Sequence, residues 1–118
     1  MLPYSMPIDW TAAQRGRVEA LLVRFRAATG GCQELAHAIH PIACERDRAA
    51  RMWRLLPAVG RYVVPKIRLE HPWYFHVTTE TQSHFVDALT GIDGTSCAGY
   101  LETHWTETDA IRWIEEAA

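Results

Sequence analysis

The chain has 118 residues, of which 48% are hydrophobic and 22% are charged, and its formal net charge is −2. This length fits a single domain spanning residues 1–118, and the apolar fraction is sufficient for a hydrophobic core. The near-neutral charge argues against a nucleic-acid-binding protein, and no apolar run is long enough to span a bilayer.

Three cysteines are present, which is an odd and low number for a disulfide scaffold. The start of the chain, MLPYSMPIDW, has neither the basic nor the apolar segment of a secretory signal peptide. We therefore expect a protein without a signal peptide that can function in a reducing compartment.

The chain is predicted to begin with an amphipathic helix within residues 11–31 that ends at Gly30-Gly31. Thr11 and Gln14 have the spacing of a capping box, which marks a helix start. The apolar side chains that recur at helical spacing are Val18, Leu21, Leu22 and Phe25.

A second helix is predicted to begin near Cys32 and to break or kink at Pro41, because proline lacks the backbone N–H that a helix interior needs. A third helix is predicted within residues 43–57, ending near Pro57. The inward-facing side chains of the second helix are expected to be Leu35, Ala36 and Ile39, and those of the third Met52, Trp53 and Leu56.

The middle of the chain is rich in β-branched and aromatic residues and is predicted to form an antiparallel sheet. The segment from about residue 106 to 116 is predicted to be a helix with Ile111 and Ile114 facing inward. This order predicts an α+β domain with N-terminal helices packed on a small antiparallel sheet. The predicted strands are residues 60–64, 66–70, 73–79 and 84–89.

The hairpin around ETQS selects one histidine and one aspartate. A turn centred between Thr81 and Gln82 places His76 opposite Asp87 on the same face of the two strands. A carboxylate at that distance can accept a hydrogen bond from an imidazole, fix its tautomer and favour its charged form. A slip of one residue would place the two side chains on opposite faces.

Cys32 supplies a candidate nucleophile, because a helix N-terminus stabilises a thiolate. Two structural interpretations remain open at this point: a free cysteine is commonly a small buried hydrophobe, and a His–Asp pair on a sheet can be purely structural. Of the other histidines, His84 is expected to be exposed beside the turn and His71 to lie outside the strand. Asp93 is expected to be a turn residue.

Taken in order, the motifs GGCQELAHAI, WYFHV and HFVDALTG resemble the papain-like fold, and in particular the small papain-fold toxin domains of bacterial polymorphic toxin systems. The resemblance spans roughly residues 12–105 and implies a catalytic triad of Cys32, His76 and Asp87. It implies a cysteine-dependent acyl-transfer enzyme, either a protein hydrolase or a glutamine deamidase, that needs no cofactor.

The resemblance further implies a bacterial effector secreted into the cytosol of a target cell, with a protein substrate and a cognate immunity protein as partners. Such enzymes usually place a glutamine upstream of the cysteine to stabilise the oxyanion. Gln14 is the only upstream glutamine, and it is too distant along the chain to be assigned this role. The backbone N–H of Cys32 is the expected donor.

Two further interpretations compete with the enzyme. The run Cys32, His37, His40 and Cys44 suggests a zinc site, but its spacing matches no finger or ribbon and Pro41 interrupts it. A catalytically inactive interaction or immunity-type protein on the same fold is the other alternative, with the five tryptophans as interface anchors. An unreactive, buried Cys32 would favour this alternative.

Overall fold

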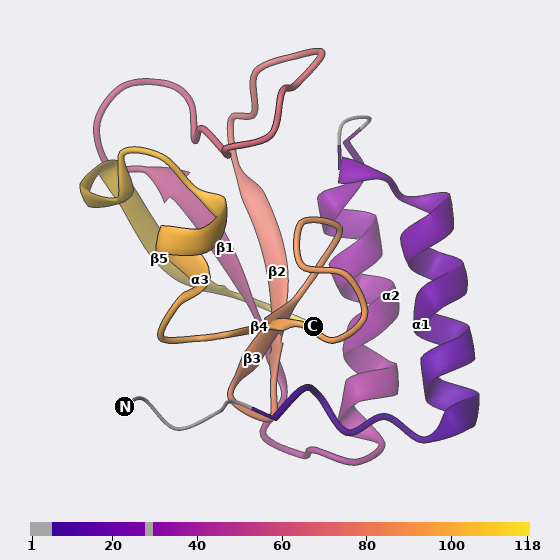
Figure 1. Cartoon of the computed structure of the whole chain (residues 1–118). Helices are drawn as coiled ribbons and strands as arrows, with labels where there is room; N and C mark the ends of the chain where they lie inside the picture. Colours follow the sequence, from indigo (N-terminus) through magenta and orange to yellow (C-terminus); the bar gives the residue numbers. More distant parts are fainter. Residues whose placement is uncertain (1–5, 28–29) are drawn as a thin grey trace.

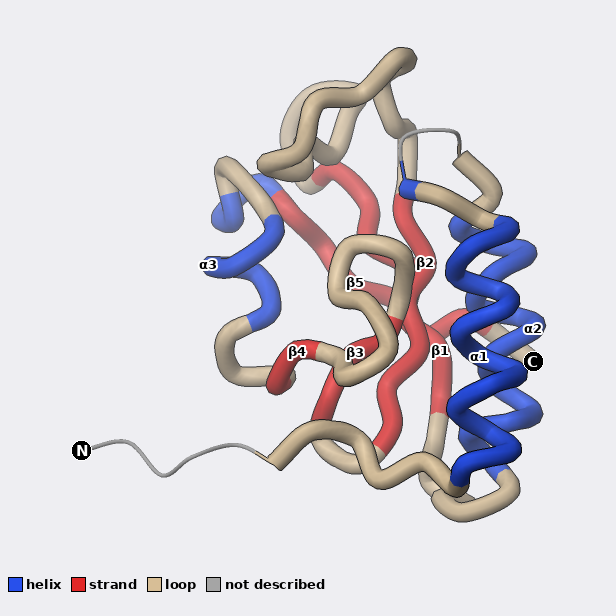
Figure 2. Tube along the Cα trace, turned by 45° about the vertical axis from the view of Figure 1, so that its right-hand side comes forward, coloured by secondary structure: helices blue, strands red, loops and turns tan. Residues whose placement is uncertain are grey.

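The computed structural model describes residues 6–27 and 30–118, which form an α+β domain. A five-stranded antiparallel sheet with the strand order β4-β3-β2-β1-β5 lies between two helical parts. Helices α1 and α2 lie side by side along one side of the sheet, and the short helix α3 lies on the other (Figures 1 and 2). The predicted α+β class, with N-terminal helices packed on an antiparallel sheet, is confirmed.

Helix α1 (Ala12–Arg24) begins at the predicted capping box. The Thr11 hydroxyl accepts a hydrogen bond from the Gln14 backbone N–H at 3.1 Å, and the Gln14 side-chain oxygen accepts one from the Thr11 N–H at 3.0 Å. The helix ends earlier than predicted, at Arg24 rather than at the glycine pair.

Helix α2 (Cys32–Cys44) begins at Cys32 as predicted, but it continues through Pro41. The predicted break is wrong because both Pro41 and His37 are exposed, so water can hydrate the His37 carbonyl that proline leaves without a donor. None of the helices in the described residues is long and apolar enough to cross a membrane.

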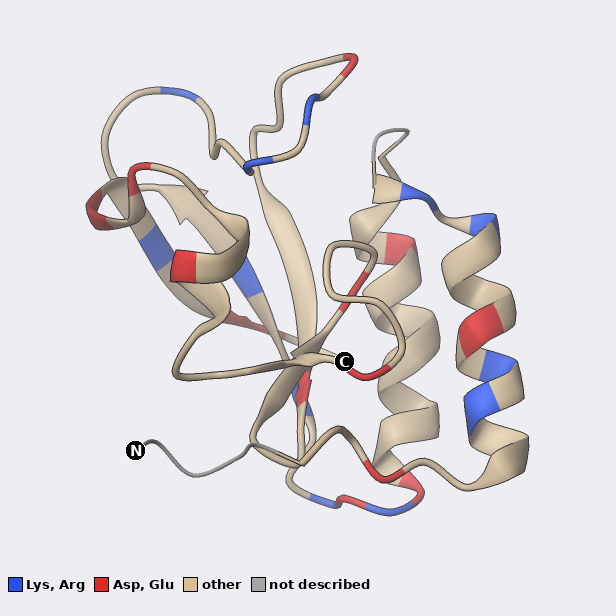
Figure 3. Cartoon of the chain, viewed as in Figure 1, with Lys and Arg blue, Asp and Glu red and all other residues tan. Residues whose placement is uncertain are grey.

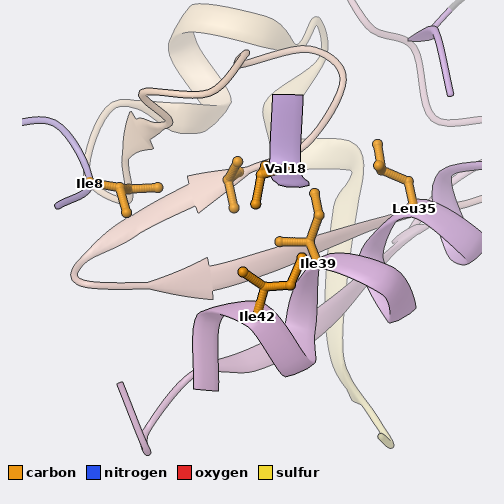
Figure 4. Close-up of a cluster of buried hydrophobic side chains, with 6 residues drawn as sticks. Ile8, Val18, Leu35, Ile39 and Ile42 are labelled. Carbon is orange, nitrogen blue, oxygen red and sulfur yellow. The ribbon is translucent and has the colours of Figure 1, made fainter. Parts of the chain in front are cut away.

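The two long helices pack on the sheet through one apolar cluster, shown in Figure 4. Residues predicted from helical spacing to face inward, among them Val18, Leu35 and Ile39, are fully buried there. The buried members of the cluster are Ile8, Val18, Leu35, Ile39, Ile42 and Val86.

The predicted third helix is wrong, because residues 51–57 form strand β1 (Arg51–Pro57) at the interior of the sheet. The predicted C-terminal helix is also wrong, since only a 3-10 turn, η2 (Thr108–Ala110), precedes strand β5 (Ile111–Glu116). Every residue of β5 pairs with a residue of β1, from Met52 with Glu116 to Pro57 with Ile111. Pairing between segments distant in sequence here overrides their local helical preference.

The predicted strands at 60–64 and 66–70 are wrong as well. Residues 58–75 form a long irregular connection, which contains an isolated bridge between Val63 and Trp73 and forms another between Pro65 and Trp105. Helix α3 (Tyr100–His104) follows the short strand β4 (Thr95–Ser96).

Strands β2 (His76–Thr81) and β3 (His84–Val86) form the predicted hairpin, but in a different register. Thr81 pairs with His84 across a two-residue turn in which Gln82 and Ser83 both have positive φ. Asp47, from the loop after α2, accepts hydrogen bonds from the Thr81 hydroxyl at 3.0 Å and the Gln82 N–H at 2.9 Å. These contacts position the turn one residue later than the sequence predicted.

Candidate active site

His76 and Asp87 are in contact. His76 is the first residue of β2, and Asp87 directly follows β3. His76 Nε2 lies 3.1 Å from Asp87 Oδ2, and both side chains are 2% exposed. Continuing the observed register places Asp87 opposite Thr78, so the His76–Asp87 contact is diagonal rather than direct. The shift changes the pairing by two residues and therefore keeps both side chains on one face of the sheet.

Asp87 is held by donors on both of its carboxylate oxygens. Its Oδ1 accepts hydrogen bonds from the backbone N–H groups of Leu89 at 2.8 Å and Thr90 at 3.2 Å, and its Oδ2 accepts the Tyr100 hydroxyl at 2.6 Å. Burial raises the pKa of Asp87, but the hydrogen bond and the charge of His76, together with hydrogen bonds from Thr78 and Tyr100, outweigh it and lower the pKa to about 2. The carboxylate is therefore ionised and fixed in place.

The surroundings of the His76 imidazole favour its positively charged form. Burial lowers its pKa, but the hydrogen bond that the ring donates to Asp87 outweighs this, together with the interaction with the Cys32 thiol, and the pKa rises to about 9. Nε2 is occupied by Asp87, and Nδ1 has no hydrogen-bond partner among the described residues. Nδ1 is therefore the ring nitrogen available to the sulfur of Cys32.

Cys32 is the first residue of α2 and is partly exposed. The start of α2 and the start of β2 lie at the same end of the molecule, which brings the thiol to the imidazole (Figure 1). The first hydrogen bond closing this helix is from Leu35 N to Gly31 O, at 2.9 Å. The backbone N–H groups of the first turn, including that of Cys32, thus have no acceptor within the helix and can stabilise negative charge.

Two tryptophans enclose the imidazole of His76. Trp73 stacks on it with ring centroids 5.2 Å apart and an interplanar angle of 12°, and Trp105 meets it at 5.1 Å and 62°. The sequence did not predict this role for Trp73 and Trp105, nor any contact of Tyr100 with the site. Trp105 and Tyr100 come from the α3 region, and no pattern in the sequence connects that region to the hairpin.

A charged network lies beside Cys32. Arg54 donates two hydrogen bonds to Glu116, at 2.9 and 3.0 Å, and His37 lies 3.1 Å from the same carboxylate. The pKa of Arg54 is raised, chiefly by its hydrogen bond to Glu116 and also by an electrostatic interaction with Cys32. A guanidinium therefore lies near the sulfur, in addition to His76.

The four residues of the hypothetical zinc site do not converge on one point, although His40 and Cys44 are in contact. His40 Nε2 lies 2.9 Å from the Ala50 carbonyl oxygen and 3.4 Å from Cys44 Sγ, while His37 pairs with Glu116. Cys32 faces His76 instead. Within residues 6–27 and 30–118, no group of three or more His, Cys, Asp or Glu side chains is arranged to hold a metal ion.

The remaining candidate residues are not part of the group formed by Cys32, His76 and Asp87. Gln14 is buried, and its side-chain NH₂ group donates a hydrogen bond to Glu45 at 3.0 Å. It therefore does not supply an oxyanion donor. His84 was expected to be exposed, but it is buried, with Nδ1 2.7 Å from the Gln82 carbonyl oxygen. His71 lies outside β2 and Asp93 lies in a turn, as predicted.

Comparison with models of protein families found no match, and comparisons with curated proteins and with solved structures found none either. Any function assigned to the chain therefore has to be argued from the geometry of this site.

Proposed function

We propose that the chain is a cysteine-dependent acyl-transfer enzyme on a papain-like domain. In this proposal Cys32 is the nucleophile, His76 the general base and acid, and Asp87 the carboxylate that orients the imidazole. The supporting observation is the His76–Asp87 contact at 3.1 Å, which leaves Nδ1 of the same ring to a partly exposed thiol at a helix start.

The first half of the reaction forms an acyl-enzyme. His76 Nδ1 takes the thiol proton, and the Cys32 sulfur forms a bond to the carbonyl carbon of an amide. The backbone N–H of Cys32 stabilises the oxyanion of the tetrahedral intermediate. His76 then returns its proton to the amide nitrogen as the C–N bond breaks, which releases an amine and leaves a thioester on Cys32.

The second half releases the acyl group. His76 takes a proton from water, whose oxygen attacks the thioester carbon. The C–S bond breaks, a carboxylic acid leaves and the sulfur takes back the proton. The Asp87 carboxylate stabilises the imidazolium in both halves, because its own low pKa of about 2 keeps it ionised. These steps involve no cofactor.

The proposed substrate is a protein. Attack on a peptide bond gives a hydrolase, and attack on a glutamine side-chain amide releases ammonia and gives a deamidase. The resemblance of residues 12–105 to papain-fold toxin domains extends the proposal to a bacterial toxin or effector that acts in a target-cell cytosol and has a cognate immunity protein. This role rests on the resemblance alone.

The alternative is a catalytically inactive interaction or immunity-type protein on the same fold. It is favoured by one observation: His76 is only 1% exposed, between Trp73 and Trp105. An imidazole that never leaves this packing can stabilise the fold without taking part in catalysis.

Site-resolved alkylation with iodoacetamide separates the two functions. Cys97 is an internal control, because burial raises its pKa to about 11, and burial also raises the pKa of Cys44. At pH 6 we expect Cys32 to be alkylated at least about tenfold faster in the wild-type chain than in the His76→Asn variant, while the slow alkylation of Cys97 stays the same in both. Equal rates for Cys32 in the two proteins would favour the interaction protein.

Expression in a bacterial cytosol tests the toxin role. We expect the wild-type chain to arrest growth, and the Cys32→Ala variant to be harmless while it keeps the circular dichroism spectrum of the folded protein. The Cys97→Ala variant is the matched control and should remain toxic. Growth arrest by Cys32→Ala at the wild-type level would reject the proposed chemistry.

A further inference from the structure

The long connection between β1 and β2 carries a concentration of exposed apolar side chains. Within the described residues, five of the eight exposed large hydrophobic side chains lie between positions 58 and 74, and the other three are scattered over the N-terminal segment, α1 and β5. The five are Val59 at 74% exposed, Tyr62 at 41%, Val64 at 43%, Ile67 at 42% and Tyr74 at 65%. We refer to residues 58–74 as the 58–74 surface.

The 58–74 surface is anchored to the rest of the domain. Val63 and Pro65 point inward and are buried, while the residues between and beside them point outward. The Lys66 N–H donates to the His104 carbonyl at 2.9 Å, and the Val64 carbonyl accepts a hydrogen bond from the Thr106 N–H at 2.9 Å. The exposed side chains are thus presented by a fixed backbone, and a partner that binds them need not order the segment first.

The same surface is basic. The segment contains three basic side chains and one acidic side chain, which are Arg61, Lys66, Arg68 and Glu70. Its net charge is therefore +2, in a chain whose net charge is −2. Figure 3 shows the basic positions along this connection. Both arginines are exposed. The charge therefore complements an acidic partner.

The 58–74 surface leads directly to the candidate active site. Tyr62 and Tyr74 contact each other with ring centroids 5.3 Å apart, and the neighbouring Trp73 stacks on His76. A depression of about 260 Å³ within the segment is lined by residues that include Tyr62, Ile67 and Pro72. A chain bound along this surface therefore approaches Cys32 and His76.

We propose that the 58–74 surface docks an extended segment of the protein substrate that combines apolar and acidic side chains. Its apolar side chains contact Tyr62, Ile67 and Tyr74, and its carboxylates face Arg61 and Arg68. The inference rests on the proposed function for the identity of the occupant as a substrate. A membrane surface would also contact apolar and basic side chains, but it would not use a concave depression or the contact with the catalytic histidine.

Peptide binding to the Cys32→Ala variant tests the docking surface without requiring turnover. The probes are four fluorescently labelled synthetic peptides of equal length, which are apolar-acidic, apolar-basic, polar-acidic and apolar-neutral. Fluorescence anisotropy should show the tightest binding for the apolar-acidic peptide. The paired substitutions Tyr62→Ser with Ile67→Ser, and Arg61→Glu with Arg68→Glu, should each weaken that binding at least about tenfold, because they remove central contacts.

The matched controls are Val23→Ser and Arg48→Glu, which change an exposed apolar and an exposed basic side chain elsewhere on the molecule. Both should bind the apolar-acidic peptide as the parent does. Binding that is absent, indifferent to peptide charge or unchanged by the paired substitutions would overturn the docking proposal. Co-sedimentation with phosphatidylserine vesicles, lost in the same variants, together with no peptide binding would overturn it in favour of a lipid surface.

Iodoacetamide labelling of Cys32 in the otherwise wild-type chain keeps the two proposals apart. Neither paired substitution alters the triad, so each should leave the labelling rate unchanged. Slow labelling with intact peptide binding would reject the proposed enzyme and leave a binding surface, whereas fast labelling without peptide binding would reject the docking surface alone.

Discussion

The Tyr100 hydroxyl donates a hydrogen bond to Asp87 Oδ2 at 2.6 Å, and His76 Nε2 contacts the same carboxylate oxygen at 3.1 Å. Tyr100 is fully buried. Its pKa lies well above the ordinary value, because burial and the charge of Asp87 both oppose ionisation, so the phenol remains a neutral donor. The α3 region thus helps to fix the carboxylate that orients the candidate base.

The Tyr100→Phe substitution removes this donor and keeps the ring that packs on Phe85. We expect a loss of about 1–2 kcal/mol in the free energy of unfolding, since a buried hydrogen bond to a charged group is lost. If Tyr100 positions Asp87, the pH profile of Cys32 alkylation should also shift, which a purely structural role would not cause. Urea denaturation and iodoacetamide kinetics measure the two effects, and Tyr62→Phe, at an exposed position, is the control.

The Asp87→Asn substitution removes the charge and keeps the shape. We expect the free energy of unfolding to fall by about 3 kcal/mol, because the buried imidazolium loses its counter-charge. Alkylation of Cys32 at pH 6 should slow at least about tenfold, because the imidazole no longer holds the proton in the correct tautomer. Asp93→Asn, in an exposed turn, should change neither quantity. Unchanged alkylation in Asp87→Asn would show that the carboxylate plays no part in activating the thiol.

The His76–Asp87 pair predicts a stability maximum in mildly acidic solution. The pKa of Asp87 is about 2 when folded and about 3.9 when unfolded, so its contribution is present above about pH 4 and is lost as the pH falls towards 2. The pKa of His76 is about 9 when folded and about 6.5 when unfolded, so its contribution is present below about pH 6.5 and is lost as the pH rises through 9.

Thermal denaturation at a series of pH values checks this window. Between pH 6 and pH 9 the free energy of unfolding should decline by roughly 3 kcal/mol, because each unit of pKa shift corresponds to about 1.4 kcal/mol. In Asp87→Asn the alkaline decline should largely disappear. A wild-type stability that does not change from pH 6 to pH 9 would contradict a charged, carboxylate-bound His76.

The backbone directly before Cys32 favours glycine. Gly31 has φ of +83°, and a Cβ there would lie 2.9 Å from Phe25 Cδ1. We expect Gly31→Ala to reduce the free energy of unfolding by about 1–2 kcal/mol, because the left-handed conformation and the contact are both unfavourable for alanine. Gly16→Ala, in the middle of α1 with nothing near the added methyl group, should instead be neutral or stabilising by up to about 1 kcal/mol. Urea denaturation of both variants distinguishes the backbone effect from a general effect of the methyl group.

Local signals in the sequence were sufficient for the N-terminal helices. The capping box of Thr11 and Gln14, the helical spacing around Val18 and the start of α2 at Cys32 were all predicted and are all present. Each depends on interactions between residues close together in the chain, so a short stretch of sequence contains the information. The same holds for the contact of His76 with Asp87. The register differs from the predicted one by two residues, and such a shift leaves both side chains on the same face of the hairpin.

Only the tertiary structure decided the rest of the sheet and the surroundings of the site. Strands β1 and β5 were predicted as helices, because their local composition permits a helix and their strand partners lie far away in the sequence. The hairpin register was set by Asp47, and the site was completed by Trp105 and Tyr100, all from other parts of the chain. Strand pairing and burial depend on partners that the folded chain brings together, so their outcome cannot be read from any single segment.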